Sequence, residues 1–147
     1  MHFTTAFIGL LSVASSAIAA PVDTQAETIA ARAPPPWILR SFKRSCNAAD
    51  TECWVSFGVD TQTSPVVNCS YGVKGDKASR KSTDGIVCGP YTVSSGWNGS
   101  FGEGHGFTTW ALVNNAQHSV AWPAYADSDL VNGVAVTPDR AFDPAWF

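Results

Sequence analysis

In the stretch Trp54-Val55-Ser56-Phe57-Gly58-Val59-Asp60, large apolar residues recur at every second position. Val55, Phe57 and Val59 would share one face of an extended chain, and the small or polar residues between them would share the other. Side chains of a β-strand alternate between two faces in this way, so the stretch predicts a half-buried antiparallel strand. Trp54 falls on the polar face, and we therefore expect its indole to be exposed.

Similar strand patterns recur on both sides of this stretch, separated by turns rich in Gly, Pro and Asn. No stretch shows a helical period over a dozen residues, and only Asp127–Leu130 is expected to form a single helical turn. Several short strands with such turns are typical of an all-β fold, here a small antiparallel β-sandwich or barrel. The predicted strands are Trp37–Ser45, Trp54–Asp60, Val66–Val73, Ile86–Trp97, Phe107–Val113, Ser119–Tyr125 and Val134–Thr137.

Two of these strands contain proline. Gly89-Pro90 is expected to form a bulge or an edge feature within Ile86–Trp97, because proline cannot donate a hydrogen bond to a neighbouring strand. For the same reason Pro123 should place its strand on an edge or end its pairing. The last segment, 138–147, is expected to be irregular, with its aromatic side chains available for packing.

The first twenty residues are typical of a secretory signal peptide. An apolar core, Thr5–Ala14, precedes the small-x-small cleavage pattern Ala17-Ile18-Ala19. This core is shorter than the about 20 residues that a membrane-spanning helix needs. Residues 21–36 are expected to be a flexible leader or propeptide, and residues 37–147 a single β domain. The sequence thus predicts a secreted, extracellular protein with no segment inserted in a membrane.

Four cysteines follow the leader: Cys46, Cys53, Cys69 and Cys88. An even number in a small secreted domain predicts two disulfide bonds. Three pairings are compatible with four cysteines. We favour Cys46–Cys53 and Cys69–Cys88, because each bond would join strands that are neighbours in the sequence.

Charge and modification motifs agree with secretion. The net charge of −3 argues against a nucleic-acid partner and against electrostatic binding to a membrane surface. Asn-X-Ser sequons occur at Asn68 and Asn98, and both are candidate N-glycosylation sites. Asn98 is the favoured site, because Asn68 precedes a cysteine that is expected to be bonded within a strand.

The dibasic pair Lys43-Arg44 has two interpretations. It resembles a processing site of the secretory pathway, and cleavage there would remove the first predicted strand. The other interpretation keeps both residues in that strand. We favour the second, because the sheet can use the residues that cleavage would discard.

The most distinctive stretch is a glycine-rich segment, residues 96–106. It contains five glycines, two aromatic residues and the only Glu-x-His pair of the chain. Such a segment is suited to an exposed connection between strands, and tryptophan beside it can anchor a protein contact or stack on a sugar ring. The predicted recognition surface consists of Trp54, Trp97, Phe101, Glu103 and His105.

The pair Glu103 and His105 also allows an enzymatic hypothesis. A small secreted hydrolase or ribonuclease could use the two side chains as general acid and base, and a ribonuclease could recruit His118 and Arg80 as well. However, no Gly-x-Ser-x-Gly motif occurs, and a metal site would need about three protein ligands, of which this pair supplies two. We therefore expect no enzyme, no metal site and no cofactor.

Several motifs resemble those of fungal small secreted proteins. They are the run Val93–Thr109, the run Trp122–Asp127, Cys88-Gly89-Pro90-Tyr91 and the early cysteine pair. These motifs are similar to those of hypersensitive-response-inducing elicitor proteins of plant-associated fungi, over nearly all of the expected β domain. The resemblance implies a disulfide-stapled β-sandwich or barrel, secretion, and a role as an effector or elicitor sensed by a host plant. It supplies no catalytic residues.

Three functional hypotheses follow. The first is a monomeric secreted effector or elicitor that a host plant protein recognises, or that acts on the plant through its surface, so that it triggers or modulates defence. The alternative is a carbohydrate-binding module for cell-wall polysaccharide, with Trp54 and Trp97 stacking on sugar rings. The third is the small hydrolase or ribonuclease described above.

Overall fold

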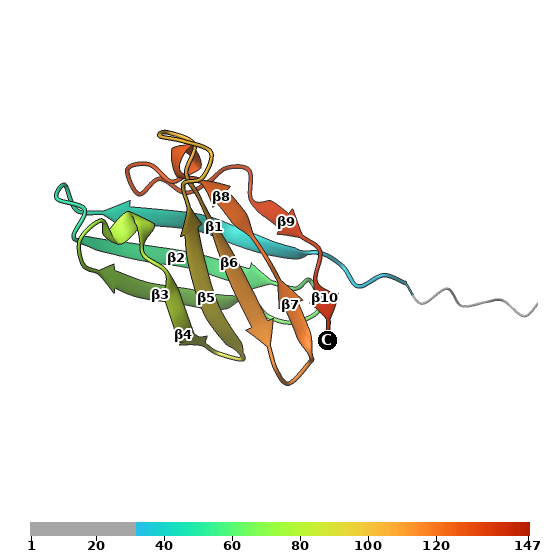
Figure 1. The fold of residues 1–147 in the computed structure, drawn as a ribbon. Helices are drawn as coiled ribbons and strands as arrows, with labels where there is room; N and C mark the ends of the chain where they lie inside the picture. Colours follow the sequence, from blue (N-terminus) through green and yellow to red (C-terminus); the bar gives the residue numbers. More distant parts are fainter. Residues whose placement is uncertain (1–31) are drawn as a thin grey trace, which may run out of the picture. The chain divides into compact units, whose positions relative to one another are not determined.

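Two antiparallel sheets packed against each other make up the protein in the computed structural model, which describes residues 32–147 (Figure 1). The expected signal peptide and most of the expected leader lie outside the described residues. Sheet A has the strand order β3-β2-β1-β9, and sheet B the order β10-β7-β6-β5-β4, with β8 also paired to β6. The all-β prediction is confirmed, and of its two forms the structure is the sandwich.

The strands of sheet A are β1 (Trp37–Cys46), β2 (Glu52–Asp60), β3 (Val67–Lys74) and β9 (Arg140–Phe142). Those of sheet B are β4 (Thr83–Cys88), β5 (Tyr91–Asn98), β6 (Phe107–Asn114), β7 (Ser119–Ala121), β8 (Ala124–Ala126) and β10 (Ala145–Trp146). The described residues also form two short 3-10 turns, η1 (Ala78–Arg80) and η2 (Asp127–Asp129). Within this described part, no helix has the length and apolarity needed to cross a membrane.

The side chains of β2 alternate between the core and the outer face of sheet A, as the sequence predicts. Val55, Phe57 and Val59 are all buried between the sheets, whereas Trp54 points the other way and is 54% exposed. Each buried side chain of this size stabilises the fold by about 1.5–3 kcal/mol relative to an exposed one. The strand pattern therefore fixes which face of sheet A meets sheet B.

An aromatic cluster fills the centre of the sandwich. The Phe42 ring lies between those of Phe57 and Tyr125, with ring centroids 5.2 and 4.3 Å away. Trp110 approaches Phe42 edge-on at 4.8 Å, and its indole Nε1 donates to the Tyr71 hydroxyl at 2.9 Å. Side chains from both sheets thus interlock in geometries that aromatic pairs favour.

A β-bulge in β1 decides which residues of that strand face the core. The register between β1 and β2 shifts between Arg40 and Lys43, around Ser41, whose φ is 49°. Before the bulge the odd-numbered positions are buried, as at Leu39, and after it the even-numbered ones are, as at Arg44. The extra residue reverses the alternation, so a charged side chain turns inward.

The two disulfides have the pairing predicted from the sequence. Cys46–Cys53 closes the hairpin of β1 and β2, and Cys69–Cys88 joins β3 of sheet A to β4 of sheet B. The second bond therefore links the two sheets covalently along one side of the sandwich.

The predicted single strand Ile86–Trp97 is wrong. The chain instead forms a hairpin of β4 and β5, in which Cys88 lies opposite Tyr91. Gly89-Pro90 forms the turn rather than a bulge. Gly89 has a φ of 56°, a conformation that glycine adopts readily and that allows the chain to reverse.

Pro123 interrupts the predicted strand Ser119–Tyr125 and divides it into β7 and β8. Proline has no N–H to donate, but the Pro123 carbonyl accepts from the Trp110 N–H at 2.8 Å, so the chain stays beside β6. The register on either side turns Trp122 away from the core, and its side chain is 54% exposed.

The C-terminal segment differs most from the prediction. Val134–Thr137 is not a strand, although the Val136 N–H donates to the Phe42 carbonyl at 2.8 Å and holds the segment along β1. The expected irregular segment 138–147 contains β9 and β10 instead. Strands of two and three residues are too short to produce a recognisable alternation, which is why the sequence pattern misses them.

An ionic cluster holds this segment against the bulge. The Arg40 guanidinium contacts the Asp60 carboxylate at 2.7 Å and the Asp139 carboxylate at 3.4 Å. Asp139 also accepts from the Ser41 N–H at 2.8 Å. The hydrogen bond from Arg40, together with one from the Gln62 N–H, lowers the pKa of Asp60 below its ordinary value.

We expect the cluster to weaken in acid. Because the folded-state pKa of Asp60 lies below its ordinary value of 3.8, its contribution is present above that value and is lost as the pH falls through the folded pKa. The free energy of unfolding, measured with urea across the acid range, should therefore depend less steeply on pH in Asp60→Asn than in the native protein. Equal slopes for the two proteins would contradict this assignment.

The two disulfides should differ in their contribution to stability. The residues joined are 19 apart in Cys69–Cys88 and 7 apart in Cys46–Cys53. Loop-closure entropy then predicts that the free energy of unfolding falls by about 3 kcal/mol when Cys69 and Cys88 are both replaced by alanine. Replacing Cys46 and Cys53 should lower it by about 2 kcal/mol. Urea unfolding of both variants measures this difference, and the reverse order would show that loop length does not control it.

Candidate functional site

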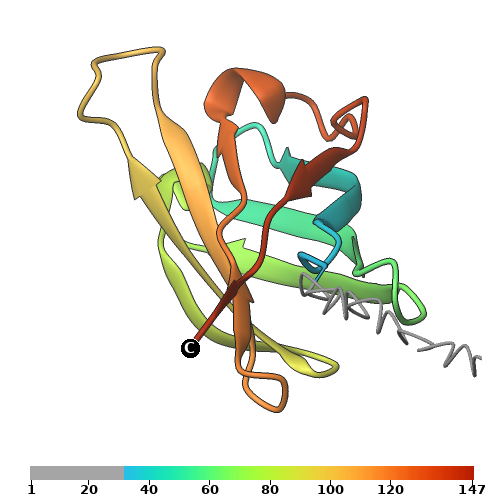
Figure 2. The ribbon, with the colours of Figure 1, turned by 90° about the vertical axis from the view of Figure 1, so that its right-hand side faces the viewer.

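The glycine loop, residues 99–106, joins β5 to β6 and extends beyond the ends of the sheets (Figure 2). Phe101, Glu103 and His105 are all exposed on it, and the Phe101 side chain is 72% exposed. A shallow concavity of about 450 Å³ lies beside the loop. It is lined by Phe101, Gly104, His105, Phe107, Ala126 and Ser128.

Of the predicted recognition residues, Phe101 and His105 meet in this concavity. Glu103 is exposed on the same loop but is not part of the lining. Trp54 lies on the outer face of sheet A, where its ring passes over Gly72. The structure thus divides the predicted surface between the glycine loop of sheet B and the outer face of sheet A.

Trp97 is half-buried and anchors the base of the loop. Its indole Nε1 donates to the Asp127 carboxylate at 2.8 Å, and the Arg80 guanidinium lies 5.0 Å from the centroid of the ring. Gly99 and Gly106 pack against the indole so closely that a methyl group at either position would overlap it. Two of the loop's glycines are therefore required for a close approach to Trp97.

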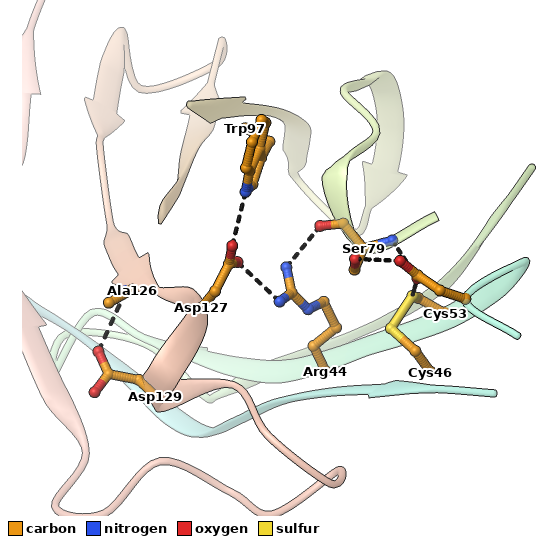
Figure 3. Close-up of polar contacts among 9 residues, drawn as sticks. Arg44, Cys46, Cys53, Ser79, Trp97, Ala126, Asp127 and Asp129 are labelled. Atoms are coloured by element: carbon orange, nitrogen blue, oxygen red, sulfur yellow. Dashed lines mark hydrogen bonds and ion pairs between the residues drawn. A yellow bond between two sulfur atoms is a disulfide. The ribbon is translucent and has the colours of Figure 1, made fainter. Parts of the chain in front are cut away.

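Asp127 connects this anchor to a buried cation. Its other carboxylate oxygen accepts from Arg44 Nη2 at 2.9 Å, and Arg44 Nη1 donates to the Ser79 carbonyl at 2.8 Å (Figure 3). The Arg44 side chain is only 8% exposed, so the bulge in β1 has placed a charge inside the protein. A buried guanidinium needs such partners, because leaving its charge unpaired is costly.

Further hydrogen bonds extend this network to the first disulfide. Asp50, in the loop closed by Cys46–Cys53, accepts from both the N–H and the hydroxyl of Ser79, at 2.8 and 2.7 Å. The Asp127 N–H donates to the Gly106 carbonyl at 2.9 Å. Arg44 therefore couples η1, η2 and the glycine loop, and we call Arg44, Ser79, Trp97 and Asp127 the Arg44 network.

The network also bears on the dibasic pair. Lys43 and Arg44 both lie in β1, in line with the interpretation that we favoured. Lys43 is exposed and Arg44 is buried. In the folded chain the Arg44 side chain is held by its bonds to Asp127 and the Ser79 carbonyl.

The arrangement offers little support for a ribonuclease with two histidines. His105 precedes β6, and His118 follows that strand of eight residues. An eight-residue strand spans roughly 25 Å, so the two imidazoles lie toward opposite ends of sheet B.

The metal-ligand geometry is equally limited. Within residues 32–147, the cluster with ligand atoms close enough to share an ion is that of Cys46, Asp50 and Cys53. The sulfur atoms of Cys46 and Cys53 form a disulfide bond. The cluster therefore offers no thiolate to a metal ion.

Both sequons are exposed. Asn98 ends β5 at the base of the glycine loop, and its side-chain oxygen accepts from the Ser100 N–H at 2.8 Å. Asn68 lies on the outer face of β3, one residue before the disulfide-bonded Cys69. Trp122 and Trp146 are exposed as well, which the sequence does not predict; the proline beside Trp122 is the one signal that indicates it.

The fold and the site define a small disulfide-stapled β-sandwich that presents an aromatic loop fixed on a buried ion pair. Comparison with protein-family models matches residues 38–147 to the family described as Effector TSP1. A curated protein of that name from Hypocrea virens is 40% identical over 146 residues, which cover 99% of this chain and 98% of the relative. The chain belongs to the Effector TSP1 family, which confirms the resemblance to fungal effector and elicitor proteins.

Removing the charge of Asp127 should destabilise the fold more than removing that of its neighbour Asp129. Each carboxylate oxygen of Asp127 accepts from a different donor, one from Arg44 and the other from Trp97. In Asp127→Asn an amide NH2 replaces one of these oxygens, so one of the two donors would lose its partner. We expect the free energy of unfolding, measured with urea, to fall by about 2–3 kcal/mol.

The matched control is Asp129→Asn, which breaks the surface pair with Arg140. This control should lose less than about 1 kcal/mol. Equal losses for the two variants would show that the Arg44 network does not stabilise the fold beyond an ordinary surface ion pair.

Proposed function

We propose that this fungal effector is secreted and that a host plant protein recognises it through the concavity beside the glycine loop. Recognition would trigger or modulate defence, with the hypersensitive response as its visible form. Membership of the Effector TSP1 family supports this proposal. The two disulfides support it too, because such bonds persist in the oxidising extracellular environment.

The exposure of Phe101 on an anchored loop is the observation that carries the proposal. The Phe101 ring is 72% exposed and lies 5.8 Å from that of Phe107, so two aromatic side chains border one concavity. Exposed aromatic side chains of this kind contribute a large share of the energy of protein interfaces. Because Trp97 and Asp127 fix the base of the loop, the loop would lose little conformational entropy when a partner binds.

In this proposal the protein acts by binding and carries no cofactor. His105 contributes an imidazole to the concavity, where it can exchange hydrogen bonds with a partner. Glu103 lies outside the lining, so the pair that could act as acid and base does not converge on one pocket. A glycan at Asn98 would stand at the base of the same loop and limit the directions of approach.

Loss of the two lining side chains should reduce the response of the plant. We expect Phe101→Ala with His105→Ala to require an about tenfold higher concentration for half-maximal cell death or defence signalling in infiltrated leaves. Trp122→Ala is the matched control, since Trp122 is exposed but lies on the outer face of sheet B, away from the concavity.

Two outcomes would contradict the proposal. If the double variant and the native protein have the same dose dependence, the concavity is not the recognised surface. If Glu103→Gln alone abolishes the response while the fold is intact, the acid and base hypothesis replaces recognition by binding.

A further inference from the structure

A second groove lies at the other end of sheet B, near the C-terminal strand β10. Its volume is about 410 Å³, which is within the range of small-ligand sites. It is lined by Pro34, Pro35, Trp37, Thr61, Thr63, Gln117 and Trp146. Gln117 belongs to the turn between β6 and β7, whereas the glycine loop lies at the opposite end of β6, so the two sites are separate.

We propose that this groove binds a neutral oligosaccharide. None of its lining residues is charged, which disfavours phosphates, acidic peptides and basic ligands. Trp146 lies in β10, and its backbone is paired with that of Ser119 in β7. The residue is nevertheless 58% exposed, so the sheet holds the indole at the rim of the groove. An exposed aromatic face on a fixed backbone suits the apolar face of a sugar ring.

The polar groups of the groove suit sugar hydroxyls. The Thr61 hydroxyl is within hydrogen-bond distance of the Thr63 and Ser64 hydroxyls, at 3.1 and 2.9 Å. Thr63 is exposed, so its hydroxyl can exchange further hydrogen bonds with a ligand. Gln117 accepts from Asn114 through Oε1, which leaves its amide nitrogen to donate to a ligand.

One wall of the groove is held in place by the fold. The Gln62 side chain donates to the Pro36 carbonyl at 2.8 Å and ties the proline run beside Trp37. Trp37 is itself buried and packs edge-on against Tyr91 at 5.4 Å. A groove that is shaped before the ligand arrives loses less entropy on binding.

This site differs from the sugar platform suggested by the sequence, which consisted of Trp54 and Trp97. The Trp97 indole is committed to Asp127 and to the glycine loop. Trp54 lies on a sheet face rather than in a groove. The inference concerns a second surface and does not rest on the proposed recognition by a host protein.

The test is a titration of the secreted, disulfide-bonded protein with cellohexaose, laminarihexaose and chitohexaose, followed by ¹H–¹⁵N NMR. We expect millimolar or tighter binding of at least one oligosaccharide. Its saturable shifts should centre on the Trp146 indole N–H, the Gln117 side chain and the Thr63 amide.

Trp146→Ala should weaken this binding by about tenfold or more, whereas Trp146→Phe should retain most of it. Trp54→Ala, which removes a similarly exposed indole, should have no effect. Circular dichroism and thermal unfolding would verify that each variant folds.

Three results would overturn the proposal: no saturable shift with any oligosaccharide, shifts centred elsewhere, or equal weakening in Trp54→Ala. An oligoproline peptide is the competing probe, because aromatic grooves also bind polyproline segments. Binding of that peptide at the groove without sugar binding would assign the site to a proline-rich partner instead.

Discussion

The buried guanidinium of Arg44 is the constraint on which the glycine-loop end of this effector depends. Its charge is stable inside the sandwich only while Asp127 and the Ser79 carbonyl remain in place. Asp127 also accepts from the Trp97 indole, and Trp97 packs against two glycines of the exposed loop. The position of the loop is therefore coupled to that of a residue in the core of sheet A.

This coupling lets the loop be exposed at its tip and ordered at its base. Five glycines in residues 96–106 would give an isolated peptide great freedom. The Arg44 network limits that freedom at the base of the loop, while Phe101 and His105 remain exposed beyond it. The uncharged groove at Trp146 lies at the other end of sheet B, so the two proposed surfaces can be occupied independently.

Sequence patterns predicted the architecture because β2, β3, β5 and β6 alternate between a more buried and a more exposed face over most of their length. Both disulfides followed from the same strand order. The site was less predictable, because Asp127 and Trp97 are 30 residues apart and Arg44 turns inward only after the bulge at Ser41 reverses the alternation of β1. A pattern of two faces contains no signal for one inserted residue, and β9 and β10 are too short to have a pattern at all.

The most direct test of this account is the backbone ¹⁵N order parameter of residues 99–106, compared between the native protein and Trp97→Leu. If Trp97 anchors the loop, values at its base should be near the roughly 0.85 of rigid backbone in the native protein and fall below about 0.6 in the variant. Equally low values in both proteins would contradict the account, since the loop would then be mobile whether or not the Arg44 network holds Trp97.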